Sequence, residues 1–179
     1  MLARALAVSA ICLSAVSPSF ASFELMLVLD AGTKSVHRFD SQTGAYFGSF
    51  GAGWFTSPQS IAIDRSRSLA YVYDSGTTTM LKFDYNTGET KGVFGFVGYL
   101  PPVHSTVLSN GNVAIAGTSA ADVFSPAGNG LFSFAFAGSR GGIGQGPDGN
   151  VYIVNMDART VGRYSSANGS LLATGPAIG

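Results

Sequence analysis

The sequence predicts an all-β protein: a β-propeller of about four four-stranded repeats of 38–44 residues, incomplete or open as a ring. The first observation behind this prediction is a phrase that recurs about every forty residues, which is typical of repeat architectures. The second is that the phrase consists of short apolar runs separated by turn residues. It reads LVLDAGTKSVHRFD at 27–40, YVYDSGTTTMLKFD at 71–84, AIAGTSAADVFS at 114–125 and YIVNMDARTVGRYS at 152–165.

Three kinds of landmark agree on the repeat length. The first apolar run ends at Asp30, Asp74, Gly117 and Asn155, the second at Asp40, Asp84, Ser125 and Ser165, and a turn glycine follows at Gly44, Gly88, Gly130 and Gly169. Successive landmarks lie between 38 and 44 residues apart, so the repeat does not rest on one chance match.

Each unit contains several strands. In the first unit, LMLVLD, SVHRFD and AYFGSF are separated by AGTK and SQTG, and such runs between turn residues are typical of strands in hairpins. A further run opens the later units, as PQSIAID at 58–64, PVHSTVLS at 102–109 and GGIGQGPD at 141–148. Four strands in about forty residues predict a propeller blade. The first unit has no such opening run.

Residues 1–21 have the layout of a secretory signal peptide. Arg4 precedes an apolar stretch, and Ser19 and Ala21 supply the small residues of a cleavage site. Cleavage near Ala21 would make the protein secreted or periplasmic. It would also remove Cys12, the only cysteine, so we expect neither a disulfide nor a thiolate metal site in the mature chain.

The remaining β-propeller domain, 22–179, carries little charge. Without Arg4 it holds 9 basic and 10 acidic residues, a formal charge of −1. Nucleic-acid binding and polybasic membrane attachment need a concentrated positive face, so we expect neither. No long apolar segment follows the leader, and we expect no membrane span there. The blades are predicted at roughly 22–57, 58–100, 101–140 and 141–179.

The second unit resembles a known repeat family. Residues 55–95, FTSPQSIAIDRSRSLAYVYDSGTTTMLKFDYNTGETKGVFG, are similar to an NHL-type propeller repeat, and 24–51 resemble its last three strands. The third unit has Ala116 or Gly117, and the fourth Asn155, where the family pattern has aspartate. The resemblance implies a propeller fold. It also extends to gluconolactonase-like propellers, some of which are metal-dependent lactonases.

The number of strands leaves the closure of the ring open. The sequence encodes three complete blades and three strands of another, and three arrangements satisfy this. The ring is small and imperfectly closed, or the chain is an open arc that completes its ring as a homodimer, or it is a truncated propeller without independent function.

Aromatic and histidine side chains are candidates for ligand binding. Trp54, Phe55 and Tyr99 lie in connections between blades, where an exposed ring would stack on a sugar or peptide. His104 lies on a predicted inner strand and would face the channel. Packing between blades is the alternative for the aromatic rings, and we favour it.

Acidic residues are candidates for a calcium site. Asp30, Asp74 and Asn155 recur at the end of the second strand, and with Asp64 they would offer oxygen ligands at one mouth of the channel. The alternative, which we favour, is that each side chain caps its own turn.

The predicted function is an exported, non-enzymatic scaffold that binds a protein, peptide or glycan without a cofactor. The sequence contains no motif that joins a nucleophile to a base and an acid. The alternative, which the family resemblance implies, is a Ca²⁺-dependent lactonase-like hydrolase whose ligands are the four residues named above.

Overall fold

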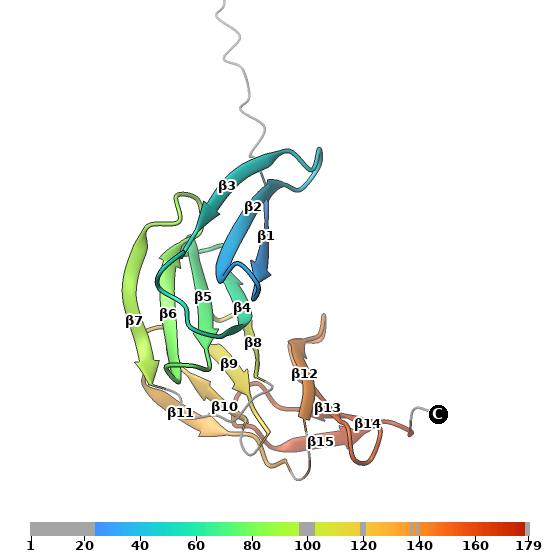
Figure 1. Ribbon diagram of the computed structural model, residues 1–179. Helices are drawn as coiled ribbons and strands as arrows, with labels where there is room; N and C mark the ends of the chain where they lie inside the picture. Colours follow the sequence, from blue (N-terminus) through green and yellow to red (C-terminus); the bar gives the residue numbers. More distant parts are fainter. Residues whose placement is uncertain (1–23, 97–102, 119–120, 137, 139, 178–179) are drawn as a thin grey trace, which may run out of the picture.

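A computed structural model describes residues 24–96, 103–118, 121–136, 138 and 140–177 (Figure 1). These residues form fifteen β-strands in four antiparallel sheets, which we call blades 1 to 4 in chain order. Blade 1 has three strands and each of the others has four. Within the described residues, no helix is long and apolar enough to cross a bilayer.

Each blade is a meander in which every strand pairs with its neighbours in the sequence. Blade 1 consists of β1 (Leu25–Asp30), β2 (Ser35–Asp40) and β3 (Tyr46–Phe50). Blade 2 consists of β4 (Pro58–Asp64), β5 (Leu69–Asp74), β6 (Thr79–Asp84) and β7 (Thr90–Phe96). Blade 3 consists of β8 (His104–Val107), β9 (Val113–Ala116), β10 (Ala121–Phe124) and β11 (Gly130–Ser133). Blade 4 consists of β12 (Arg140–Gln145), β13 (Val151–Asn155), β14 (Thr160–Tyr164) and β15 (Leu171–Thr174).

The repeated aspartates at the ends of β2 and β6 hold the hairpin turns that follow these strands. Asp40 Oδ1 accepts hydrogen bonds from the amides of Gln42 and Thr43, both at 2.8 Å. The N–H of Gly44 then closes the turn on the Asp40 carbonyl, with a φ of 72° that favours glycine. Asp84 caps the equivalent turn of blade 2 in the same way.

In blade 3 the left-handed turn glycine is Gly128, with a φ of 88°, and not the expected Gly130. The reason is a shorter turn. The N–H of Gly128 bonds to the carbonyl three residues earlier, at Ser125, whereas Gly44 bonds to the carbonyl four residues earlier. Gly130 begins β11 instead.

The hydrophobic core lies between the blades. Blades 1 and 2 enclose Val36, Phe50, Phe55, Val72, Leu81 and Phe83. Blades 2 and 3 enclose Tyr71, Tyr73, Met80, Phe94, Val103, Val113 and Ile115, among others. Blades 3 and 4 enclose Val123, Phe134, Val151, Ile153 and Tyr164, among others. Each internal blade is therefore buried on both faces, which is why β5 has almost no exposed residue.

The four blades form an arc (Figure 1). Strands β4, β8 and β12 are the innermost strands of their blades and lie on the concave side, where β8 contacts both of the others. In blade 1 the innermost described strand is β1, which corresponds to the second strand of the other blades. The expectation of three complete blades and a three-stranded one is thus confirmed for the described residues, and blades 1 and 4 lie at opposite ends of the arc.

Candidate functional site

A depression of about 400 Å³ lies where the inner strands of blades 2, 3 and 4 end. We call it the mouth pocket. Its polar lining residues are Asp64, Arg65, Ser66, Thr106, Ser109 and Gln145. All of them belong to the end of an inner strand or to the turn that follows it. The pocket thus arises because the repeat brings equivalent segments of three blades together.

Asp64 is the most buried of these polar residues, with 3% of its surface exposed. Its carboxylate accepts hydrogen bonds from Ser66 Oγ at 2.6 Å and from the Arg67 guanidinium at 2.7 Å. Burial acts to raise the pKa of Asp64, but these hydrogen bonds outweigh burial and hold the pKa below its usual value. Asp64 is therefore ionised at neutral pH and is balanced by Arg67.

Two side chains hold the walls of the pocket in place. Arg67 packs on the β8–β9 turn so closely that a Cβ at Gly111 would collide with its guanidinium. Gln145 Oε1 accepts a hydrogen bond from the N–H of Ser109 at 2.7 Å, and its Nε2 donates to the carbonyl of Gly149 at 2.7 Å. Arg67 therefore packs blade 2 against the β8–β9 turn of blade 3, and Gln145 joins blade 4 to blade 3 by a hydrogen bond.

The predicted calcium ligands lie mostly at the other end of the blades. Asp30 Oδ1 accepts hydrogen bonds from the amides of Gly32 and Thr33, at 2.7 and 3.2 Å, and thereby caps its own turn. Asn155 Oδ1 accepts one from the amide of Ala158 at 2.9 Å, in the same kind of turn.

Asp74 has a different role. It is fully buried, accepts a hydrogen bond from Thr77 Oγ1 at 2.9 Å, and also accepts the amides of Thr56 and Ser57 in the connection that enters blade 2. The carboxylate therefore ties the β5–β6 turn to the preceding connection. Local turn capping alone predicts only part of this arrangement.

The structure does not bring the four predicted ligands together. Asp74 pairs with Pro58 at one end of β5, whereas Asp64 pairs with Leu69 at the other end. Five residues of strand separate the two ends, or about 17 Å at the usual rise per residue. Among the described residues, no group of three His, Cys, Asp or Glu side chains is placed to hold a metal ion.

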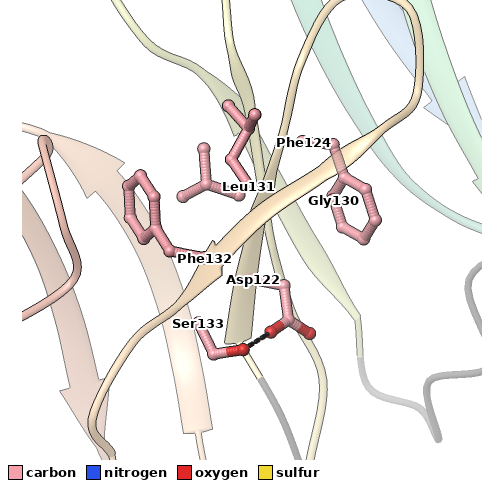
Figure 2. Close-up of a pocket in the computed structure, with 7 residues that line it drawn as sticks. Asp122, Phe124, Gly130, Leu131, Phe132 and Ser133 are labelled. Atoms are coloured by element: carbon pink, nitrogen blue, oxygen red, sulfur yellow. Dashed lines mark hydrogen bonds between the residues drawn. The ribbon is translucent and has the colours of Figure 1, made fainter.

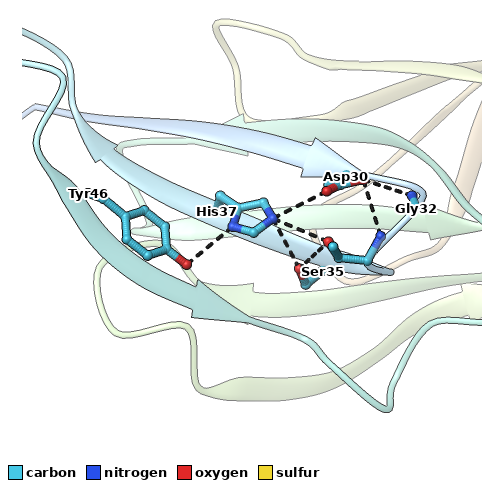
Figure 3. A network of polar contacts seen from close by, with 6 residues as sticks. Asp30, Gly32, Ser35, His37 and Tyr46 are labelled. Carbon is cyan, nitrogen blue, oxygen red and sulfur yellow. Dashed lines mark hydrogen bonds and ion pairs between the residues drawn. The ribbon is translucent and has the colours of Figure 1, made fainter.

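A polar network surrounds His37 on the outward face of blade 1 (Figure 3). Asp30 Oδ2, Ser35 Oγ and Thr33 Oγ1 lie 3.5, 3.4 and 3.2 Å from His37 Nε2, and Tyr46 OH lies 3.3 Å from Nδ1. A serine nucleophile needs its histidine to contact the serine through one nitrogen and the acid through the other. Here the Asp30 carboxylate and the Ser35 hydroxyl both lie next to Nε2, so the network does not form that relay.

The four predicted ligand-binding residues are placed differently from one another. Trp54 is 51% exposed, whereas Phe55 is 5% exposed and packs on Phe83 with ring centroids 5.5 Å apart. Phe55 therefore belongs to the core between blades and is not presented to a ligand. His104 begins β8 and is partly exposed, and Tyr99 lies outside the described residues.

A second depression, of about 420 Å³, lies on the β10–β11 hairpin (Figure 2). Leu131 and Phe132 supply apolar surface, and the Ser133 hydroxyl donates a hydrogen bond to Asp122. The hairpin is the outer half of blade 3. This depression uses one blade, so it lacks the convergence of repeated elements that distinguishes the mouth pocket.

Asp148, in the turn between β12 and β13, has a lowered pKa. Its carboxylate accepts hydrogen bonds from Asn150, Tyr152 and Arg163, at 2.9, 3.1 and 2.8 Å. The hydrogen bond from the Asn150 side chain is the main cause that lowers the pKa of Asp148 to about 2.

A lowered carboxyl pKa stabilises the fold above the unfolded value of about 4, and this stabilisation is lost as the pH falls toward 2. We expect Asp148→Asn to lower the melting temperature at pH 5, and we expect this deficit to shrink at pH 2. Thermal melts of the wild type and of Asp148→Asn between pH 5 and pH 2 measure the difference in melting temperature. A deficit that stays constant over this range would contradict the assignment.

Most of the mouth pocket was not predictable from the sequence. Thr106, Ser109 and Gln145 are ordinary polar residues, and the one predicted site residue among the lining is Asp64. The available signal was positional, because all four residues lie within the opening runs of their units, at 58–64, 102–109 and 141–148. That these residues from three blades line one pocket can be predicted only when the inner strands are known to lie side by side.

No family model matches the chain, and no curated protein matches it. Solved structures do resemble it. They include hydrazine synthase of Kuenenia stuttgartiensis (TM-score 0.68, 15% identity), a protein of unknown function from Bacteroides caccae (0.59, 16%) and one from Bacteroides thetaiotaomicron VPI-5482 (0.64, 17%). The matches cover 84, 86 and 84% of this chain, respectively, but only 45, 58 and 44% of the matched chains. The chain thus spans about half the length of these structures.

At such low identity the likeness concerns the fold alone. Together with four antiparallel meanders in an arc, it defines the class: the chain is an all-β, incomplete or open β-propeller of about four blades, as the repeats predict. The narrower resemblance to NHL-type and gluconolactonase-like repeats stays a prediction.

Proposed function

We propose that the chain is an exported, non-enzymatic scaffold that binds a polar ligand, a glycan or a peptide, in the mouth pocket. The observation that supports this proposal is the convergence of three blades on one depression lined by hydroxyl, amide, carboxylate and guanidinium groups. Glycans and peptide backbones both offer donors and acceptors in close alternation. A pocket held in shape by Arg67 and Gln145 would bind them with little loss of its own conformational freedom.

Catalysis has weaker support. The carboxylate of Asp64 is engaged by Ser66 and Arg67, and the histidine network of blade 1 does not form a nucleophile relay. No observation on the described residues favours the calcium-dependent lactonase-like alternative.

The experiment uses the chain expressed with residues 1–21 and recovered from the exported fraction. We expect its mass to correspond to a chain that begins at Ser22. Glycan arrays and a displayed peptide library are then probed with the wild type, with Ser109→Trp, which fills the pocket, and with Gln42→Trp, a matched change in an exposed turn of blade 1. Ligands of the wild type should bind Ser109→Trp at least about tenfold more weakly.

The three proteins separate the outcomes. Gln42→Trp should bind like the wild type, and the class of probe retained tells a glycan from a peptide ligand. Equal binding by Ser109→Trp, or no binding of either class by the wild type, would contradict the mouth pocket as the binding site. A full-length mass in the exported fraction would contradict cleavage near Ala21.

A further inference from the structure

The two end faces of the arc differ from all other blade faces. We call the outward face of blade 1 the leading face, with Met26, Val28, His37, Phe39 and Tyr46. The outward face of blade 4 is the trailing face, with Tyr152, Val154 and Val161. No described segment covers either one, and on the leading face Met26 is 47% exposed and Val28 41% exposed.

The leading face corresponds, residue by residue, to a buried face of blade 2. A shift of 44 residues converts the pairing of Val28 with His37 into that of Val72 with Leu81. Those two residues of blade 2 are 0% and 5% exposed, because they pack on blade 1. The leading face is thus built like a surface that another blade covers.

The trailing face corresponds to the opposite face of blade 2. A shift of 81 residues converts the pairing of Tyr73 with Met80 into that of Val154 with Val161. Tyr73 and Met80 are each 0% exposed, because blade 3 covers them. The trailing face is therefore the first half of one more contact between blades.

The two faces are complementary halves of a contact that the chain makes three times within itself. In the second of these contacts, Tyr73 of blade 2 and Ile115 of blade 3 belong to one buried cluster. By position in the repeat, Tyr73 corresponds to Val154 on the trailing face, and Ile115 corresponds to Val28 on the leading face. Blades 1 and 4 lie at opposite ends of the arc, so these halves do not meet among the described residues of one molecule (Figure 1).

We propose that a second copy of this chain covers both faces. The trailing face of each copy packs on the leading face of the other, and the two arcs close a two-fold ring of eight blades. A contact between unlike faces either closes into a ring or continues as a filament. Two arcs joined by two identical contacts leave no end face exposed. This pairing does not depend on a ligand in the mouth pocket.

The test is the mass in solution of the exported protein, measured by light scattering over a range of concentrations. We expect a discrete dimer for the wild type. Val28→Asp and Val154→Lys each place a charge among the apolar side chains of this contact and should weaken the dimer on the order of 100-fold or more. Val93→Asp is the matched control, because Val93 is 51% exposed on β7 and lies on neither end face.

An equal mixture of Val28→Asp and Val154→Lys supplies the decisive measurement. In the mixed pair one contact is wild type and the other places aspartate opposite lysine, so the mixture should recover the dimer that neither variant forms alone. Thermal melts establish that each variant folds. A wild type that stays monomeric, a wild type that polymerises, or a mixture of folded variants that stays monomeric would overturn the proposal.

Discussion

Replacing Phe83 with alanine is expected to lower the free energy of unfolding by about 3–5 kcal/mol. Phe83 is 1% exposed, and its ring lies 5.2 Å from that of Phe50 and 5.5 Å from that of Phe55, centroid to centroid. Its removal would leave a cavity where blade 1, blade 2 and their connection meet. Urea unfolding of the two proteins, followed by circular dichroism, measures the change.

The control for this substitution is Phe47→Ala on β3, since Phe47 is 45% exposed. We expect it to lower stability by no more than about 1 kcal/mol. When blades stack in a row, the stability of each blade depends chiefly on its contacts with the neighbouring blades. Hydrogen exchange in Phe83→Ala should therefore accelerate in β1–β3 more than in β12–β15, and equal acceleration in both would contradict this account.

Asp74→Ala is expected to lower the free energy of unfolding by about 2–4 kcal/mol. The substitution removes a fully buried acceptor and leaves the amides of Thr56 and Ser57 and the hydroxyl of Thr77 without it. A buried donor without an acceptor is costly because water does not replace the lost hydrogen bond. Urea unfolding at neutral pH gives the change in midpoint.

Asp84→Ala is the matched control. Asp84 also accepts two backbone amides, those of Asn86 and Thr87, but it does so in an exposed hairpin turn. Water can solvate these amides after the substitution, so we expect a loss of about 1 kcal/mol or less. Equal losses for Asp74→Ala and Asp84→Ala would show that the connection between blades 1 and 2 does not depend on Asp74.

The repeats predict the fold because strand pairing within a blade is local. The runs ending at Asp30 and Asp40 become β1 and β2, with a register set by the turn between them. The partners of Asp74 and the burial of Phe55 were not predictable in the same way. Both depend on where the connection between blades 1 and 2 passes over its neighbours, and a turn pattern carries no information about that.

Arg140 is a further residue that local pattern cannot predict. It begins β12, is 4% exposed and donates hydrogen bonds to the carbonyls of Gly117 and Thr118, at 3.1 and 3.0 Å. Gly117 stands where blade 2 has the buried Asp74. Blade 3 thus lacks the carboxylate that fastens blade 2 to its preceding connection, and a guanidinium from blade 4 binds this turn instead. The sequence of a single repeat unit does not reveal that an arginine of the next blade replaces the aspartate in this way.

The meander order of the strands also determines how the chain can fold during its synthesis. Blade 2 has all four of its strands once residue 96 has emerged, and no segment from the far end is needed to complete its pairing. Contacts between residues close in sequence lose little entropy on closure and form early. Each new blade can therefore form on the one that precedes it. At every stage of growth the newest blade presents the sheet face on which the next blade will assemble.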